Sequence, residues 1–151
     1  NAGQYPLSVL ALTDRCASAY RRGLYGNTMT SNPRALDVGI AVLDSVDDEL
    51  RENIRVRGRE LREKLGALGE TTEGAVVGAQ GTGLLLSCEL AERYKIHGSD
   101  STEDYLRRIG LAVIHGGKRS LRYTPVFNIG EKEVDLIVNL TRKALVEGPT
   151  H

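Results

Sequence analysis

The pattern of apolar and polar positions divides the chain into two parts near Gly69. Residues 5–12 carry apolar side chains on both alternating faces, which is typical of a strand buried on both sides of a sheet. Asn32 can cap a helix that starts at Pro33 and runs to Val46, because proline at the first helical position loses no hydrogen bond. This helix is apolar almost all round, so we expect it to be buried on most sides.

A second helix is expected over residues 47–68, where an apolar stripe lies opposite a charged face. After Gly69 the apolar runs shorten to strand length and alternate with glycine turns, which predicts a smaller α+β unit. Ser101 with Asp104 three residues later predicts a helix start of the capping-box type. The expected elements are strands at 75–77, 84–90, 111–115 and 120–124, helices at 101–109 and 131–146, and an earlier short helix at 14–20 capped by Thr13.

The composition excludes several classes of protein. With 151 residues, the chain has the length of one ordinary domain. Lys plus Arg and Asp plus Glu are 20 each, so the formal net charge is zero and no general attraction to nucleic acid or to an anionic membrane is expected. No apolar run approaches the roughly 18 residues that a membrane span requires. We therefore expect no nucleic-acid partner and no membrane partner.

The cysteines and histidines form no recognisable metal or catalytic cluster in the sequence. Cys16 and Cys88 are too few for a disulfide framework, which makes a reducing, cytoplasmic setting the default expectation. No Cys/His spacing resembles a metal site, and no metal is expected. The histidines share no spacing with carboxylates or cysteines that would form a triad, so we interpret all three as incidental: His97, His115 and His151.

The charged residues of the helix predicted at 47–68 are interpreted as a solvated face. Their signs are balanced, and pairs such as Glu60 with Lys64 have the spacing of helical ion pairs. No aromatic residue is interleaved with the basic ones, so the helix does not resemble a nucleic-acid-binding surface.

The loop of residues 26–33 concentrates hydroxyl and amide side chains just before a helix N-terminus. The free N–H groups and the positive end of the helix dipole at such a place favour a phosphate or a carboxylate. The alternative is that Ser31 and Asn32 only cap the helix. Both interpretations stay open at this point.

Arg122 is a second candidate for binding an anion. Its neighbours Leu121 and Tyr123 indicate a partly buried strand, and a guanidinium held on a sheet can pair with a carboxylate through two hydrogen bonds. A structural or surface arginine is the alternative. The segment Gly81-Thr82-Gly83 could let a ligand approach the backbone, although a simple turn before a strand is the favoured interpretation.

Four segments follow one another in an order that is typical of one enzyme family. They are Tyr5-Pro6, Gly26-Asn27-Thr28-Met29-Thr30-Ser31-Asn32-Pro33, Gly81-Thr82-Gly83-Leu84-Leu85 and Leu121-Arg122-Tyr123-Thr124-Pro125. With these segments the chain resembles the C-terminal part of a class III, pyridoxal-phosphate-dependent aminotransferase of fold type I. That family includes ornithine, acetylornithine and 4-aminobutyrate aminotransferases.

The resemblance implies a site for pyridoxal 5'-phosphate (PLP) that is shared across a homodimer. Thr28, with the backbone N–H of Asn27 or Thr28, matches the residues that bind the cofactor phosphate of the neighbouring subunit. Arg122 matches the arginine that pairs with a substrate carboxylate. The implied reaction transfers an amino group between an amine or amino acid and a keto acid or aldehyde.

Several positions depart from the family pattern. Asn27 replaces the usual serine, Met29 replaces an aromatic residue, and Val126 replaces the second proline after Arg122. Gln80 stands where an arginine often precedes the glycine turn. These differences weaken any transfer of substrate identity from known members.

The resemblance also implies an α/β organisation in three parts. Residues 1–46 match the end of the large cofactor-binding domain, 47–68 a connecting helix, and 69–151 a small α+β domain with a three- to four-stranded, mostly antiparallel sheet covered by helices. The family's Schiff-base lysine would lie just before Asn1. We therefore expect no catalytic residue in this chain, and no activity from it alone.

Two alternatives to a piece of an aminotransferase stay open. The first is a non-catalytic interaction or dimerisation domain, in which residues 5–12 would have to pair within the chain. The second is an isomerase or decarboxylase of the same cofactor family, because the type of reaction is set largely by upstream residues.

Overall fold

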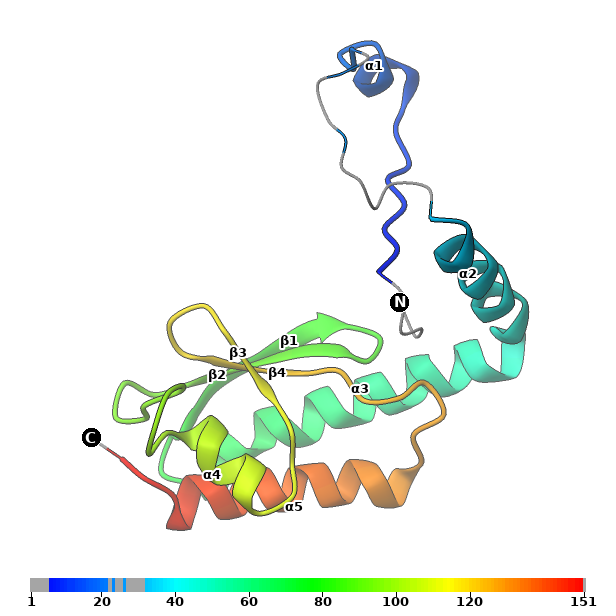
Figure 1. The fold of residues 1–151 in the computed structure, drawn as a ribbon. Coiled ribbons are helices and arrows are strands. Elements are labelled where there is room, and N and C mark those ends of the chain that lie inside the picture. The colour runs from blue at the N-terminus through cyan, green and yellow to red at the C-terminus, as the bar shows by residue number, and fades with distance from the viewer. Residues whose placement is uncertain (1–5, 22, 24–25, 27–31, 151) are drawn as a thin grey trace. The chain divides into compact units, whose positions relative to one another are not determined.

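The computed structural model describes residues 6–21, 23, 26 and 32–150. The chain divides into two compact units, Asn1–Asp47 and Asp48–His151, which are described separately. The first contains α1 (Asp14–Ala17) and α2 (Pro33–Ser45). The second contains the sheet and the other helices (Figure 1).

Side-chain caps start both helices of the first unit. Thr13 Oγ1 accepts a hydrogen bond from the backbone N–H of Cys16 at 3.4 Å, and Asn32 Oδ1 accepts one from that of Arg34 at 3.0 Å. Each cap satisfies a backbone donor that has no partner inside its helix. The predicted start of α2 is confirmed, whereas α1 ends at Ala17, earlier than predicted.

Two expectations for the first unit are wrong. Residues 6–12 form no strand, and Val9 is 86% exposed. A strand needs a neighbour for its backbone groups, and the described residues of this unit contain none. Nor is α2 buried on most sides, because Ala35 is its one buried residue and Leu43 is 73% exposed. Apolar surface indicates that an element can be buried, but it does not supply the covering partner.

The second unit is a four-stranded antiparallel sheet with helices packed against it (Figure 1). Its strand order is β1-β2-β4-β3, so the first strand and the third strand form the edges. This arrangement confirms the predicted α/β fold and its antiparallel sheet. The bounds are α3 (Asp48–Thr71), β1 (Val76–Thr82), β2 (Leu85–Leu90), α4 (Thr102–Arg108), β3 (Ile114–Gly116), β4 (Ser120–Tyr123) and α5 (Glu131–Glu147).

Alternation along the strands gives the sheet one buried face and one open face. The buried face packs against apolar side chains of α3 and α5, such as Leu65 and Val134, in one hydrophobic core. Removing this surface from water stabilises the fold by roughly 25 cal/mol per Å². The buried side chains of the two central strands are Leu86, Cys88, Leu90, Leu121 and Tyr123.

Glycines allow α3 to lie directly against β1 and the turn that follows it. A Cβ atom on Gly58 would lie 2.1 Å from the carbonyl oxygen of Gly83, and one on Gly69 would lie 2.6 Å from that of Val76. No side chain therefore separates the helix from the strand at these points. Gly83, with φ of +54°, and Leu84 connect β1 to β2, so the chain reverses slightly later than the sequence predicts.

Candidate functional site

Arg122 lies on β4, one of the two central strands. Its register partners are Ser87 on β2 and Ile114 on β3. Leu121 and Tyr123, on either side of it, are buried in the core, so Arg122 faces the open side of the sheet. The expectation that Arg122 is partly buried is wrong. Its side chain is exposed because its apolar neighbours belong to the opposite face.

A cavity of about 710 Å³ opens beside Arg122 on this face. Its walls come from all four strands, and they combine a guanidinium with amide and hydroxyl side chains. The structure thus brings Arg122 together with the predicted glycine segment, which lies far away in the sequence. The lining residues are Gln80, Gly81, Thr82, Leu85, Leu86, Ser87, Gly116 and Arg122.

The guanidinium of Arg122 passes over Gly116 of the neighbouring edge strand. A Cβ atom on Gly116 would lie 3.6 Å from Nη2 and 3.8 Å from Nε of Arg122. No carboxylate among the described residues forms an ion pair with Arg122. A guanidinium carries five N–H donors in a planar fork, which matches the two oxygens of a carboxylate. The cavity can therefore bind a carboxylate-bearing molecule.

The strand that carries Arg122 is anchored from its buried side. The Tyr123 hydroxyl and Thr141 Oγ1 of α5 are 3.1 Å apart, and Thr141 Oγ1 donates to the carbonyl oxygen of Ile137 at 2.8 Å. Burial raises the pKa of Tyr123 far above its usual range, and burial raises the pKa of Cys88 to about 12. Both groups are therefore neutral at physiological pH, and neither places a negative charge on the buried face of the sheet behind Arg122.

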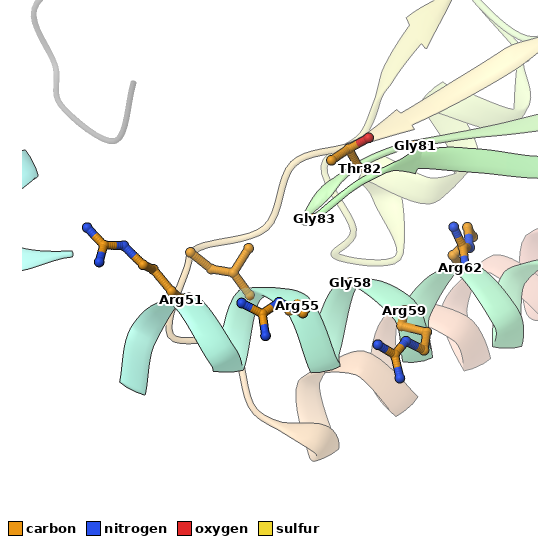
Figure 2. A pocket seen from close by; sticks show the side chains of 9 residues that line it. Arg51, Arg55, Gly58, Arg59, Arg62, Gly81, Thr82 and Gly83 are labelled. Atoms are coloured by element: carbon orange, nitrogen blue, oxygen red, sulfur yellow. The ribbon is translucent and has the colours of Figure 1, made fainter. Parts of the chain in front are cut away.

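Figure 2 shows a second cavity, of about 420 Å³, between α3 and the end of β1. Four arginines follow one another along the helix, and the segment Gly81–Gly83 lies above it. From the sequence alone these arginines are interpreted as part of a solvated face, because the positive and negative residues of the helix are balanced and no aromatic residue is interleaved. The spacing of three or four residues, which places side chains on one side of a helix, would have revealed this row. The arginines are Arg51, Arg55, Arg59 and Arg62.

The sequence of residues 1–145 matches the family described as aminotransferase class-III. The chain belongs to this family. The predicted resemblance is confirmed.

Curated relatives of this class-III aminotransferase chain are much longer than the chain itself. The acetylornithine aminotransferase of Neisseria meningitidis serogroup A is 30% identical over 130 residues, which are 85% of this chain and 32% of that protein. The succinylornithine transaminase of Citrobacter koseri is 28% identical over 137 residues, or 87% of this chain and 32% of that protein. The chain spans about one third of the length of these relatives.

Solved structures of the family share the fold. The acetylornithine aminotransferase of Elizabethkingia anophelis is 26% identical and has a TM-score of 0.68 over 87% of this chain and 34% of its own. The ornithine aminotransferase of Toxoplasma gondii, which has PLP in partial occupancy at its active site, is 22% identical. Its TM-score is 0.66, over 85% of this chain and 30% of its own.

The residues predicted to hold the cofactor phosphate in this aminotransferase chain, Asn27 and Thr28, lie outside the described residues. Their roles stay predictions. Among the residues that the structure does describe, no group of three or more His, Cys, Asp or Glu side chains could hold a metal ion. No helix in the described part of the chain is long and apolar enough to cross a membrane.

The histidines are less isolated than the sequence indicates. The rings of His97 and His115 have centroids 4.7 Å apart, and His115 Nδ1 lies 2.9 Å from Glu103 Oε2. Glu103 lies on α4, His115 on β3 and His97 in the segment before α4, so the contact depends on the fold and no fixed sequence spacing predicts it. His151 lies outside the described residues.

Proposed function

We propose that this chain is the C-terminal portion of a PLP-dependent aminotransferase. The enzyme would transfer an amino group between an amine or amino acid and a keto acid or aldehyde. The family match over residues 1–145 supports the class of reaction. The observation that carries the proposal for this chain is Arg122, whose side chain has no acidic partner among the described residues and lines a cavity on the open face of the sheet.

In this proposal Arg122 binds the carboxylate of the substrate. Two parallel N–H···O bonds fix both the position and the orientation of a carboxylate. Hydrogen bonds to charged groups contribute about 1.5–3 kcal/mol each. Gln80, Thr82 and Ser87 add uncharged donors and acceptors along the same cavity, where they can orient the rest of the substrate.

The cofactor belongs to the proposal as well. Asn27 and Thr28 would hold the phosphate of PLP, across the interface of a homodimer in the cytoplasm. When bound, PLP supplies the electron sink for chemistry at the amino-bearing carbon, and the protein supplies position and charge. Among the described residues no lysine lines the Arg122 cavity. In this proposal the reactive lysine lies elsewhere in the enzyme, and this chain alone is inactive.

The test is an Arg122→Gln variant of the complete enzyme. We expect KM for carboxylate-bearing amino donors to rise roughly tenfold to hundredfold, because the ionic partner of the carboxylate is lost. The KM for an amine without a carboxylate should stay within about twofold on the same grounds. Arg142→Gln on α5 is the matched control, since Arg142 is exposed and forms no ion pair among the described residues.

The outcome of this test also addresses the alternatives. An equal loss with both kinds of donor, or no loss with either, would contradict the role of Arg122. Racemised or decarboxylated product in place of amino-group exchange would identify a different reaction of the same cofactor family. The presence of bound PLP in Arg122→Gln, followed by its visible absorbance, separates substrate binding from cofactor binding.

A further inference from the structure

We propose that the cleft between α3 and the end of β1 is a second anion-binding site, separate from Arg122. Its ligand would be a small molecule with two or more phosphate or carboxylate groups. The cavity measures about 420 Å³, within the range of small-molecule sites. The feature is defined by the four arginines Arg51, Arg55, Arg59 and Arg62 and is called the arginine cleft below.

The arginines are arranged along one side of α3. Their spacing of four, four and three residues places their backbone positions on one side of the helix, and Figure 2 shows the four side chains spreading in different directions from it. Arg51 and Arg62 are separated by about 16 Å along the helix axis. A single monovalent anion cannot reach all of these side chains, whereas a molecule with several charged groups can contact two or more of them.

The positive charge of the row is not neutralised in its C-terminal half. Arg51 pairs with Asp48 at 3.0 Å and Arg55 with Glu52 at 2.5 Å, and both pairs are exposed. Arg59 has no acidic partner among the described residues, and neither has Arg62. Exposed ion pairs are worth only about 0–1 kcal/mol, so a ligand can displace Asp48 or Glu52 at small cost.

The other side of α3 is different. There Glu60 accepts from both Arg57 and Lys64, and Lys64 also donates to Asp135 of α5 at 2.5 Å. The charges on the side that meets α5 are therefore paired with one another, whereas Arg59 and Arg62 on the side of the cleft form no ion pair among the described residues. This segregation distinguishes the row from a solvated face with alternating signs.

The wall opposite the arginines is made mainly of the backbone of residues 81–83. Gly58 allows the helix to touch the carbonyl group of Gly83, and a Cβ atom on Gly81 would lie 2.1 Å from the carbonyl oxygen of Leu85. A residue larger than glycine would therefore clash with backbone at position 58 or 81. Thr82 also lines the cleft, although Figure 2 shows its hydroxyl pointing away from α3. A ligand in the cleft can thus contact guanidinium groups on one side and backbone on the other.

The test measures binding of two probes, pyrophosphate and citrate, by titration calorimetry at constant ionic strength. The variant is Arg59→Gln/Arg62→Gln, because glutamine keeps a similar helix propensity and the side chains are exposed. The matched control is Lys132→Gln/Arg142→Gln on α5, which removes the same charge from exposed residues without described ion pairs. Circular dichroism verifies that both variants are folded.

We expect at least one probe to bind at least about tenfold more weakly to Arg59→Gln/Arg62→Gln, with the control within about twofold of the unaltered protein. Dependence of pyrophosphate on these arginines would assign a phosphate ligand, and dependence of citrate a carboxylate ligand. Equal affinities in all variants, or no binding of either probe, would overturn the proposal.

Arg122→Gln separates this site from the one proposed above. It should leave probe binding at the arginine cleft within about twofold, because Arg122 does not line this cavity. Loss of probe binding in Arg122→Gln, with Arg59→Gln/Arg62→Gln unaffected, would place the anion on the open face of the sheet and contradict a second site.

Discussion

Gly58 of α3 faces the carbonyl group of Gly83 so closely that a Cβ atom would lie 2.1 Å from its oxygen. The opposing atom is backbone, which cannot rotate away as the end of a side chain can. Through this contact α3 packs directly against the turn between β1 and β2. Both residues line the arginine cleft, so this contact forms part of its floor.

A Gly58→Ala substitution should destabilise the second unit. Overpacking costs about 1–3 kcal/mol and outweighs the gain in helix propensity of up to about 1 kcal/mol. Gly66→Ala is the matched control, because its Cβ atom would lie 3.9 Å from that of Ala79, an ordinary contact. We expect Gly66→Ala to be neutral or stabilising in urea unfolding. Equal stability of both variants would show that the backbone near Gly83 adapts freely.

A Tyr94→Phe substitution should lower the free energy of unfolding by about 1–2 kcal/mol. The Tyr94 hydroxyl donates to the carbonyl oxygen of Leu145 at 2.8 Å in the core, near the end of α5. Tyr105→Phe is the control, since its hydroxyl contacts exposed Glu147 at 3.4 Å and should contribute less than about 0.5 kcal/mol. Chemical denaturation of both variants gives the comparison, and a larger loss in Tyr105→Phe would contradict it.

The two cysteines should differ in reactivity and in their effect on alkaline stability. Cys16 is exposed, whereas burial raises the pKa of Cys88 from its usual 9.0 to about 12. An aromatic disulfide reagent at pH 8 should therefore modify Cys16 rapidly and Cys88 only after unfolding. Rapid modification of two thiols in the folded protein would contradict the burial of Cys88.

The raised pKa of Cys88 also predicts how the stability of the fold changes with pH. Below pH 9 the thiol of Cys88 is protonated in the folded and unfolded states, so its contribution is fully present. Between pH 9 and about 12 the unfolded state loses the proton first, and stability decreases as pH rises. Tyr123, whose pKa burial also raises, acts in the same direction. Cys88→Ala should show a weaker decline over this range, measured by unfolding at several pH values.

The size of the side chain at position 116 should affect the position of the Arg122 guanidinium. Gly116→Ala places its Cβ atom 3.6 Å from Nη2 of Arg122, which is ordinary contact, so we expect little change. Gly116→Val adds two methyl groups in the same direction and should displace the guanidinium while suiting an edge strand. In the complete enzyme, KM for a carboxylate-bearing donor should rise several-fold in Gly116→Val only. An unchanged KM would indicate that Arg122 binds the carboxylate from another rotamer.

Local sequence signals predicted where the helices start, but they did not predict which segments are covered by other parts of the chain. Asn32 before Pro33 and Ser101 before α4 mark helix starts in the sequence, and both side chains accept the expected backbone hydrogen bonds. Residues 6–12 have the apolar pattern of a buried strand, yet a strand also needs pairing partners, which the pattern does not contain. The same limit explains why Leu43 of α2 is exposed.

The sequence offered Arg122 as a candidate, but it predicted neither the cavity beside it nor most of the residues that line that cavity. The motif around Arg122 identified the arginine, whereas its exposure follows from which face of β4 meets α3 and α5. The cavity that joins Arg122 to Gly81 and Thr82 depends on the pairing of β2 with β4, a long-range contact. The roles of Asn27 and Thr28 stay predictions.

Gly81 and Thr82 line both the Arg122 cavity and the arginine cleft. One short strand end is therefore a common wall of the two cavities, and a ligand that displaced this strand end from one cavity would change the shape of the other. Thermodynamic linkage makes such an effect mutual: if an anion in the cleft changes the affinity for a carboxylate at Arg122 by some factor, the carboxylate changes the affinity for the anion by the same factor.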